Sequence, residues 1–117
     1  IEGGFVQGAG WLGCEEVNWK SNGQITTHSP STYKIPAVSD MPEKFNAEIF
    51  KKGKNIENVI NKSKTTGEPP LMNAMSVFFA IKNAIASIGN YTKNPTLNAP
   101  ATPEKILMSI KNLRKKI

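Results

Sequence analysis

The segment 67–70, with the sequence Gly-Glu-Pro-Pro, carries the side chain best suited to chemistry, the carboxylate of Glu68. Pro69 disfavours helical backbone angles at the residue before it, so we expect Glu68 to be extended at the mouth of a following helix. Gly67 tolerates unusual backbone angles and lets a ligand approach closely. A carboxylate held rigidly in this way could act as a general base. Taken alone, the pattern favours a simpler role, in which an acid at a helix start offsets the helix dipole.

Residues 8–13 read Gly-Ala-Gly-Trp-Leu-Gly and match the G-x-G-x-x-G pattern of dinucleotide-binding loops letter for letter. That pattern binds a pyrophosphate only where it follows a parallel strand and opens a helix, with an acidic residue about twenty positions further on. Only seven residues precede Gly8, and Tyr33 stands near the position where the acid is needed. The spacing therefore favours tight packing of the glycines over nucleotide binding.

The other reactive side chains form no recognisable site in the sequence. His28 has no second histidine and no suitably spaced cysteine or carboxylate, so no metal site is predicted. Cys14 is the only cysteine, which excludes an internal disulfide and is compatible with a reducing compartment. We expect Trp11 and Trp19 to be packing residues rather than platforms for stacked bases.

Residues 1–16 predict a helix that close packing must hold, because they contain five glycines. Each glycine costs about 1 kcal/mol of helix stability relative to alanine. The side expected to be buried consists of Phe5, Val6, Trp11 and Leu12. Beyond this helix, the alternating stretches 17–19 and 24–27 flank an Asn-Gly turn at 20–23, a pattern that predicts a β-hairpin.

Residues 28–42 are expected to form a loop, because prolines and small polar residues dominate them. Phe45, Ala47 and Ile49 alternate with polar residues and predict a short strand at 45–50. A lysine-rich connection then leads to a brief return to strand at 59–60.

Apolar residues at spacings of three and four predict an amphipathic helix over 71–88, which Gly89 ends. Its stripe consists of Leu71, Met75, Phe78, Ile81, Ile85 and Ile88, widened by Met72 and Phe79. A last helix is predicted from the N-cap Thr102 and Pro103, with apolar residues at Ile106, Ile110, Leu113 and Ile117. The basic run 114–116 complements the dipole of that helix. The chain is thus predicted to be a single α+β unit over 1–117.

The net charge of +6 raises the question of nucleic-acid binding. However, fourteen of the fifteen cations are scattered lysines, and Arg114 is the only arginine, the residue suited to bidentate recognition of phosphates and bases. The charge therefore favours a solvated surface, and a basic binding module without catalytic activity stays the weaker alternative. No apolar stretch approaches the roughly 18 residues of a membrane span.

Five separate stretches, in the same order, closely resemble the C-terminal part of the molybdenum-binding domain of xanthine dehydrogenases. They are IEGGFVQG (1–8), PSTYKIP (30–36), GEPPL (67–71), VFFAIK (77–82) and APATPE (99–104). Related aldehyde oxidases share the general pattern but commonly replace the Pro-Pro pair that follows the glutamate. The resemblance therefore leans towards the xanthine type, with an aldehyde or another N-heterocycle as the alternative substrate.

The resemblance implies an oxidoreductase that converts hypoxanthine and xanthine to urate in purine catabolism. The glutamate that matches Glu68 is the general base of this family and takes a proton from a hydroxyl on the molybdenum. Gly67 is implied to lie against the molybdopterin cofactor through its backbone. Iron–sulfur clusters, FAD and NAD serve the parent enzyme outside this segment. We accordingly expect a fragment of a larger molybdenum-binding domain, located in the cytoplasm, whose parent is oligomeric.

Three departures limit what the segment can do alone. The family has a cofactor-contacting glutamine immediately before the residue that matches Ile1, and its purine-binding arginine and glutamate lie upstream as well. Thr65 and Thr66 replace the more usual Ala-Val pair before the glycine. We therefore expect the segment alone to be inactive, with the rest of the molybdenum domain and the iron–sulfur and FAD parts of the enzyme as its partners.

Overall fold

The computed structural model describes residues 1–64 and 67–115, which form four α-helices and two short 3₁₀ turns. The helices are α1 (Glu2–Gly13), α2 (Pro69–Asn73), α3 (Met75–Ser87) and α4 (Pro103–Arg114). The 3₁₀ turns are η1 (Val38–Asp40) and η2 (Ile60–Lys62). No described helix is long and apolar enough to cross a membrane.

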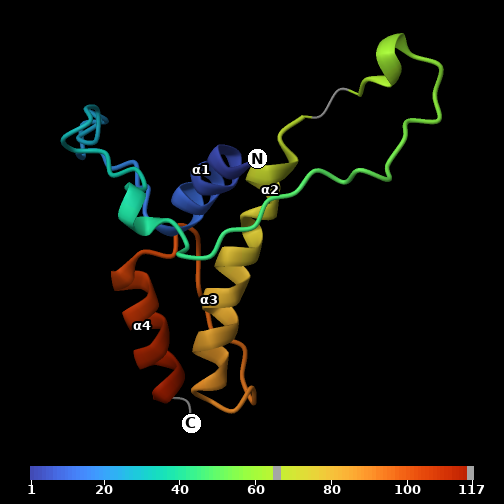
Figure 1. The fold of residues 1–117 in the computed structure, drawn as a ribbon. Coiled ribbons are helices and arrows are strands. Elements are labelled where there is room, and N and C mark those ends of the chain that lie inside the picture. The colour runs from blue at the N-terminus through green and yellow to red at the C-terminus, as the bar shows by residue number, and fades with distance from the viewer. Residues whose placement is uncertain (65–66, 116–117) are drawn as a thin grey trace.

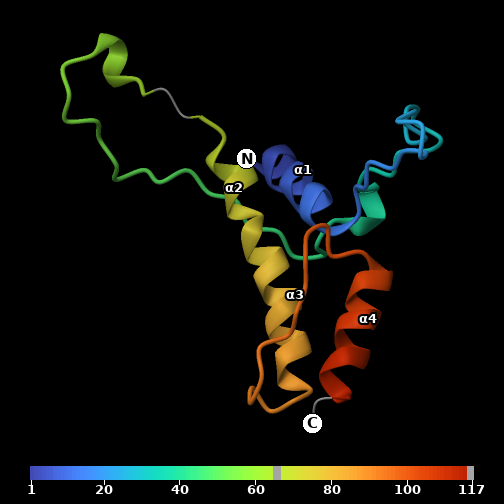
Figure 2. The ribbon, with the colours of Figure 1, turned by 180° about the vertical axis from the view of Figure 1, so that it is seen from behind.

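The core lies between α3, α4 and the segment that connects them. Figures 1 and 2 show α3 and α4 side by side and running in the same direction. Residues 88–102 run antiparallel to both helices and connect the end of α3 to the start of α4. Four residues are buried together at this junction: Ile85, Leu97, Ala101 and Leu113. Phe78, Ile81, Ile106 and Ile110 pack around them. The apolar stripes predicted for the two C-terminal helices are thus confirmed where they face each other.

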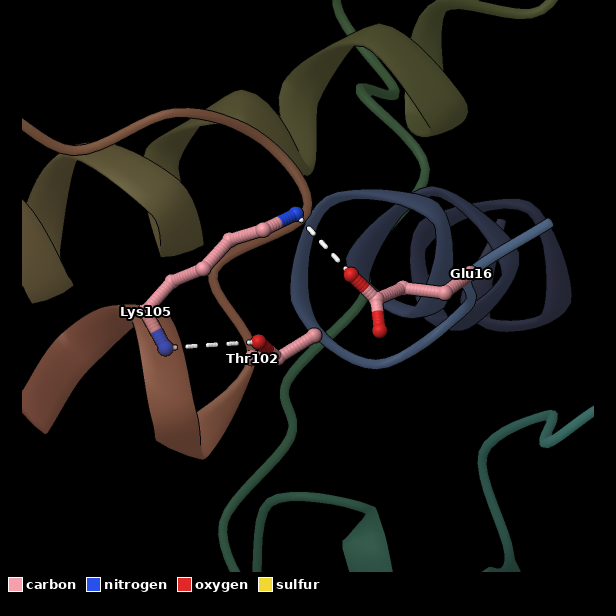
Figure 3. A network of polar contacts seen from close by, with 3 residues as sticks. All are labelled: Glu16, Thr102 and Lys105. Atoms are coloured by element: carbon pink, nitrogen blue, oxygen red, sulfur yellow. Dashed lines mark hydrogen bonds and ion pairs between the residues drawn. The ribbon is translucent and has the colours of Figure 1, made fainter. Parts of the chain in front are cut away.

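Helix α4 begins as predicted. The Thr102 side chain accepts a hydrogen bond from the Lys105 amide at 3.4 Å, and Pro103 occupies the first turn. Lys105 also forms an ion pair with Glu16, with 2.9 Å between Nζ and Oε1, and so links the start of α4 to the residues that follow α1 (Figure 3). Ile117 and Lys116, assigned above to this helix and its basic end, lie outside the described residues.

The helix predicted over 71–88 is present but divided. Ala74 separates α2 from α3, and the bonds there span three residues rather than four: Ala74 N–H to the Leu71 carbonyl (3.2 Å) and Val77 N–H to the Ala74 carbonyl (3.0 Å). Such tighter bonds are typical of a local 3₁₀ turn. The two prolines start the helix earlier than predicted, at Pro69.

The predicted β-hairpin is wrong. Residues 17–27 turn back on themselves at Gly23, whose φ of +84° suits a tight turn, but only one antiparallel bridge forms, between Trp19 and Ile25. Trp19 is 64% exposed, and Val17 and Ile25 are also about half exposed. An isolated two-stranded ribbon needs a sheet or helix to pack against, and no described element covers this one.

The strands predicted at 45–50 and 59–60 are also wrong. Residues 45–50 are irregular and largely exposed, and Ile60 opens the turn η2 instead. Because the residues that the structure describes contain no strand, the β part of the predicted α+β class is not borne out, and the regular structure of these residues is helical. Alternation favours a strand only where a neighbouring strand or core is available to receive it.

Two long segments leave the helices. Residues 15–36 and residues 43–64 extend away from the helices on opposite sides (Figure 1). The radius of gyration is 18.6 Å, whereas a compact chain of this length has about 13 Å. Several large apolar side chains are more than three quarters exposed, namely Val38, Ile49, Phe50, Ile56 and Ile60. These surfaces are of the kind that proteins normally cover with further chain.

Candidate active site

The glycines of α1 allow it to lie directly on α2. Gly8 and Gly10 are buried, and Gly4 is half-buried. A Cβ on Gly8 would stand 2.7 Å from the Ala74 Cβ and closer still to the Leu71 carbonyl oxygen. The interpretation of residues 8–13 as packing glycines is therefore confirmed for Gly8 and Gly10, whereas Gly13 has open space around its α-carbon.

The same geometry excludes a dinucleotide loop. A pyrophosphate binds where a glycine-rich turn opens a helix and exposes its first amides. Here α1 begins at Glu2, so Gly8 and Gly10 lie inside the helix, where the amides are bonded along the chain. The letters of the motif match, but the backbone does not.

Glu68 stands where the sequence predicted, at the start of a helix. It is the N-cap residue of α2, with a non-helical backbone (φ −120°, ψ 55°), and its side chain is exposed. Its carbonyl oxygen accepts hydrogen bonds from the amides of Leu71 (3.0 Å) and Met72 (3.3 Å). The backbone of Glu68 is therefore fixed to α2 while its carboxylate stays open to solvent.

Gly67, immediately before Glu68, is also exposed to solvent. Its φ is +47°, a left-handed conformation that a residue with a side chain adopts only with strain. A Cβ at this position would meet no atom of the described residues within 4 Å. Gly67 and Glu68 thus form an exposed surface, called the ledge below, which could line one side of a larger site. The described residues around them do not enclose it. Thr65 and Thr66, just before the ledge, lie outside the described residues.

A separate hollow of about 250 Å³ lies beside α1. Its lining includes Phe5, Ala9, Cys14, Pro36 and Val77, and does not include Glu68. Burial raises the pKa of the Cys14 thiol, an effect that the positive charge of Lys34 partly opposes and that Glu15 and Asp40 reinforce. A thiol with a raised pKa is a poor nucleophile near neutral pH, so this hollow has no sign of covalent chemistry.

One polar link beside that hollow was not apparent from the sequence. The Tyr33 hydroxyl donates a hydrogen bond to the Glu15 carboxylate at 2.5 Å, and this bond raises the pKa of Tyr33. Eighteen residues separate the partners, and no local pattern relates them. His28 is exposed, and no cluster of three or more metal-binding side chains occurs among the residues placed by the structure.

Comparisons with known proteins show what the sequence is similar to. Residues 1–42 match the family model of the molybdopterin cofactor-binding domain. The chain is 46% identical to a xanthine dehydrogenase/oxidase of Felis catus over 91% of its own length, and 43% identical to xanthine dehydrogenase 1 of Arabidopsis thaliana over 93%. It is 42% identical to a xanthine dehydrogenase of Oryza sativa over the same share.

The matched region is a small part of those proteins. The chain spans 8% of the length of the cat enzyme and 9% of each plant enzyme. The similarity nevertheless extends over nine tenths of this chain, far beyond any single motif. By sequence, the chain is a segment similar to xanthine dehydrogenases, and its first 42 residues match a molybdopterin cofactor-binding domain.

Proposed function

We propose that the chain is the C-terminal part of the molybdenum-binding domain of a xanthine dehydrogenase, and that Glu68 is the general base of purine hydroxylation. The observation that carries the proposal is the similarity to xanthine dehydrogenases over more than 90% of the chain, combined with an exposed carboxylate at the N-cap of α2. The substrates proposed are hypoxanthine and xanthine, with urate as the product.

The placement of Glu68 supports a catalytic role over a purely structural one. Helix α2 has only five residues, so its dipole is small, and the Glu68 side chain makes no capping hydrogen bond to it. A base needs a carboxylate that is free to accept a proton at hydrogen-bond distance from its donor. The backbone bonds of Glu68 fix the position of the residue and leave its carboxylate available for that purpose.

Molybdopterin fits this segment as a neighbour rather than as a group that it encloses. The open α-carbon of Gly67 leaves room for a cofactor against the backbone, and Glu68 follows directly. When bound, the cofactor supplies the redox chemistry. The part of this chain is to hold the Glu68 carboxylate beside the reacting centre and to accept the proton of the oxygen nucleophile that attacks the purine carbon. Electrons would leave through iron–sulfur clusters and FAD elsewhere in the enzyme.

The test is the conversion of xanthine to urate by the complete enzyme that carries this segment, with Glu68→Gln compared with wild type. Removal of a general base typically costs about 10²- to 10⁴-fold, so we expect kcat to fall at least a hundredfold with molybdenum content unchanged. Glu104→Gln is the matched control, because Glu104 is likewise an acid at the start of a helix, in the first turn of α4. It should leave kcat within about twofold, as surface substitutions generally do.

Two results would contradict the proposal. Equal, small effects of Glu68→Gln and Glu104→Gln would make Glu68 an ordinary helix-start acid. If the wild-type enzyme turns over aldehydes or other N-heterocycles faster than xanthine, the proposed substrate is wrong, while the proposed role of Glu68 as the base is unaffected.

A further inference from the structure

The contact between α1 and α2 depends on glycine at one position. A Cβ at Gly8 would collide with the Leu71 carbonyl oxygen and lie 2.7 Å from the Ala74 Cβ. Because the first of these atoms belongs to the backbone, it cannot turn aside as a flexible side chain does. Any residue larger than glycine at position 8 therefore forces one of the two helices to move.

One turn earlier, Gly4 continues the same contact more loosely. A Cβ there would stand 3.2 Å from the Pro70 Cβ and 3.7 Å from the Leu71 amide nitrogen. Gly4 and Gly8 thus face residues 70–74, and Figures 1 and 2 both show α1 against α2. Helix α2 has its closest packing here, since Met72 and Asn73 on its other sides are exposed.

Movement of α2 is transmitted to Glu68 through a short and stiff path. The Glu68 carbonyl is bonded to the amides of Leu71 and Met72, and the rings of Pro69 and Pro70 fix their φ angles. The Glu68 side chain is exposed and adds no cap bond of its own. The position of the carboxylate is therefore set by the backbone of α2, and the position of α2 is set by α1.

We propose that Gly8 is a positioning residue for Glu68: the absence of a side chain at Gly8 fixes the distance between α1 and α2 and thereby the place of the carboxylate. This inference rests on the proposed function of Glu68 as the base. A misplacement of about 1 Å can cost on the order of a hundredfold in rate, so small shifts of α2 would be visible in turnover.

The experiment compares Gly8→Ala with Gly13→Ala in the complete enzyme. Both changes add one methyl group to α1, but a Cβ at Gly13 meets no described atom within 4 Å. We expect Gly8→Ala to lower kcat for xanthine about tenfold or more, with KM nearly unchanged and molybdenum retained. Gly13→Ala should stay within about twofold. Gly4→Ala, which needs only a small displacement of Pro70, should give a smaller loss and serves if Gly8→Ala does not fold.

Two further measurements separate positioning from general damage. Hydrogen exchange in the peptide that covers residues 68–74 should speed up in Gly8→Ala and not in Gly13→Ala, whatever the cofactor content. In a Glu68→Gln background, Gly8→Ala should cause no additional loss of kcat, because the group that it positions is already gone.

The outcomes distinguish the two proposals. If Glu68→Gln keeps normal turnover, the proposed base is wrong, and the role of Gly8 falls with it. If Glu68→Gln loses most of its kcat while Gly8→Ala and Gly13→Ala have the same kcat and the same hydrogen exchange, the role of Glu68 as the base is retained. Only the positioning role of Gly8 is then overturned. Equal losses from Gly8→Ala with and without the Glu68 carboxylate would also overturn it.

Discussion

The amide of Ala101 donates a hydrogen bond to the carbonyl oxygen of Leu12 at 2.6 Å, which joins the end of α1 to the residue just before the N-cap of α4. Together with the ion pair between Glu16 and Lys105 (Figure 3), it connects the helix that packs on α2 to the helical core. The ledge of Gly67 and Glu68 is therefore joined to the core through α1 as well as through α3.

The core between α3 and α4 should depend strongly on Leu113, which is only 3% exposed. Leu113→Ala removes buried methyl groups and leaves a cavity, so we expect the free energy of local unfolding to fall by about 2–5 kcal/mol. Hydrogen exchange of α4 peptides in the complete enzyme measures this loss. Leu107→Ala, on the same helix but half exposed, should change it by less than about 1 kcal/mol. Similar losses at the two positions would mean that α4 is buried differently from this arrangement.

The N-cap of α4 should contribute less to stability than the buried Leu113 side chain does. Thr102→Ala removes the oxygen that accepts the Lys105 amide hydrogen and should cost about 1 kcal/mol of stability at the helix start. Thr102→Ser keeps a hydroxyl at the same place and should restore most of it. Exchange of the Lys105 amide is the measurement. An unchanged rate in Thr102→Ala would show that the 3.4 Å contact contributes nothing.

Helix α4 could be predicted from sequence because its signals are local. The spacing of Ile106, Ile110 and Leu113 and the Thr-Pro start lie within a few turns of one another. The failures at 17–27 and 45–50 have the opposite cause: alternation there implies a neighbour to pair with, and no described element supplies one. For the site, the Glu-Pro-Pro sequence was enough to place Glu68 at a helix start. The contact that fixes α2 joins Gly8 to residues more than sixty positions away, and no local pattern reveals it.

Alkaline titration should report on the bond between Tyr33 and Glu15. The hydroxyl donates to the carboxylate, so loss of its proton removes the bond and sets two negative charges together; the pKa of Tyr33 is accordingly raised above 10.0. Because the folded-state pKa is the higher one, the stability from this bond is present below pH 10 and is lost as the pH rises through the folded-state value. Glu15→Gln should lower the pKa of Tyr33, seen in the ultraviolet absorbance of the phenolate, with Tyr33→Phe identifying the signal. A titration curve unaffected by Glu15→Gln would contradict the bond.

The chain expressed by itself should self-associate. Its exposed apolar side chains include Ile56 (91%) and Ile60 (84%) on the segment 43–64, beyond what a monomer of this size normally leaves uncovered. Light scattering at increasing concentration should show particles heavier than the 12.8 kDa monomer. The double variant Ile56→Asp with Ile60→Asp should reduce the association, because two charges on the segment oppose its contact with a second apolar surface. Lys54→Gln with Lys62→Gln is the matched control, since it lowers the charge of the same segment by the same two units and keeps its apolar residues. A monodisperse monomer of the unmodified chain would show that these surfaces need no covering, and an equal effect of both double variants would assign the association to charge instead of apolar contact.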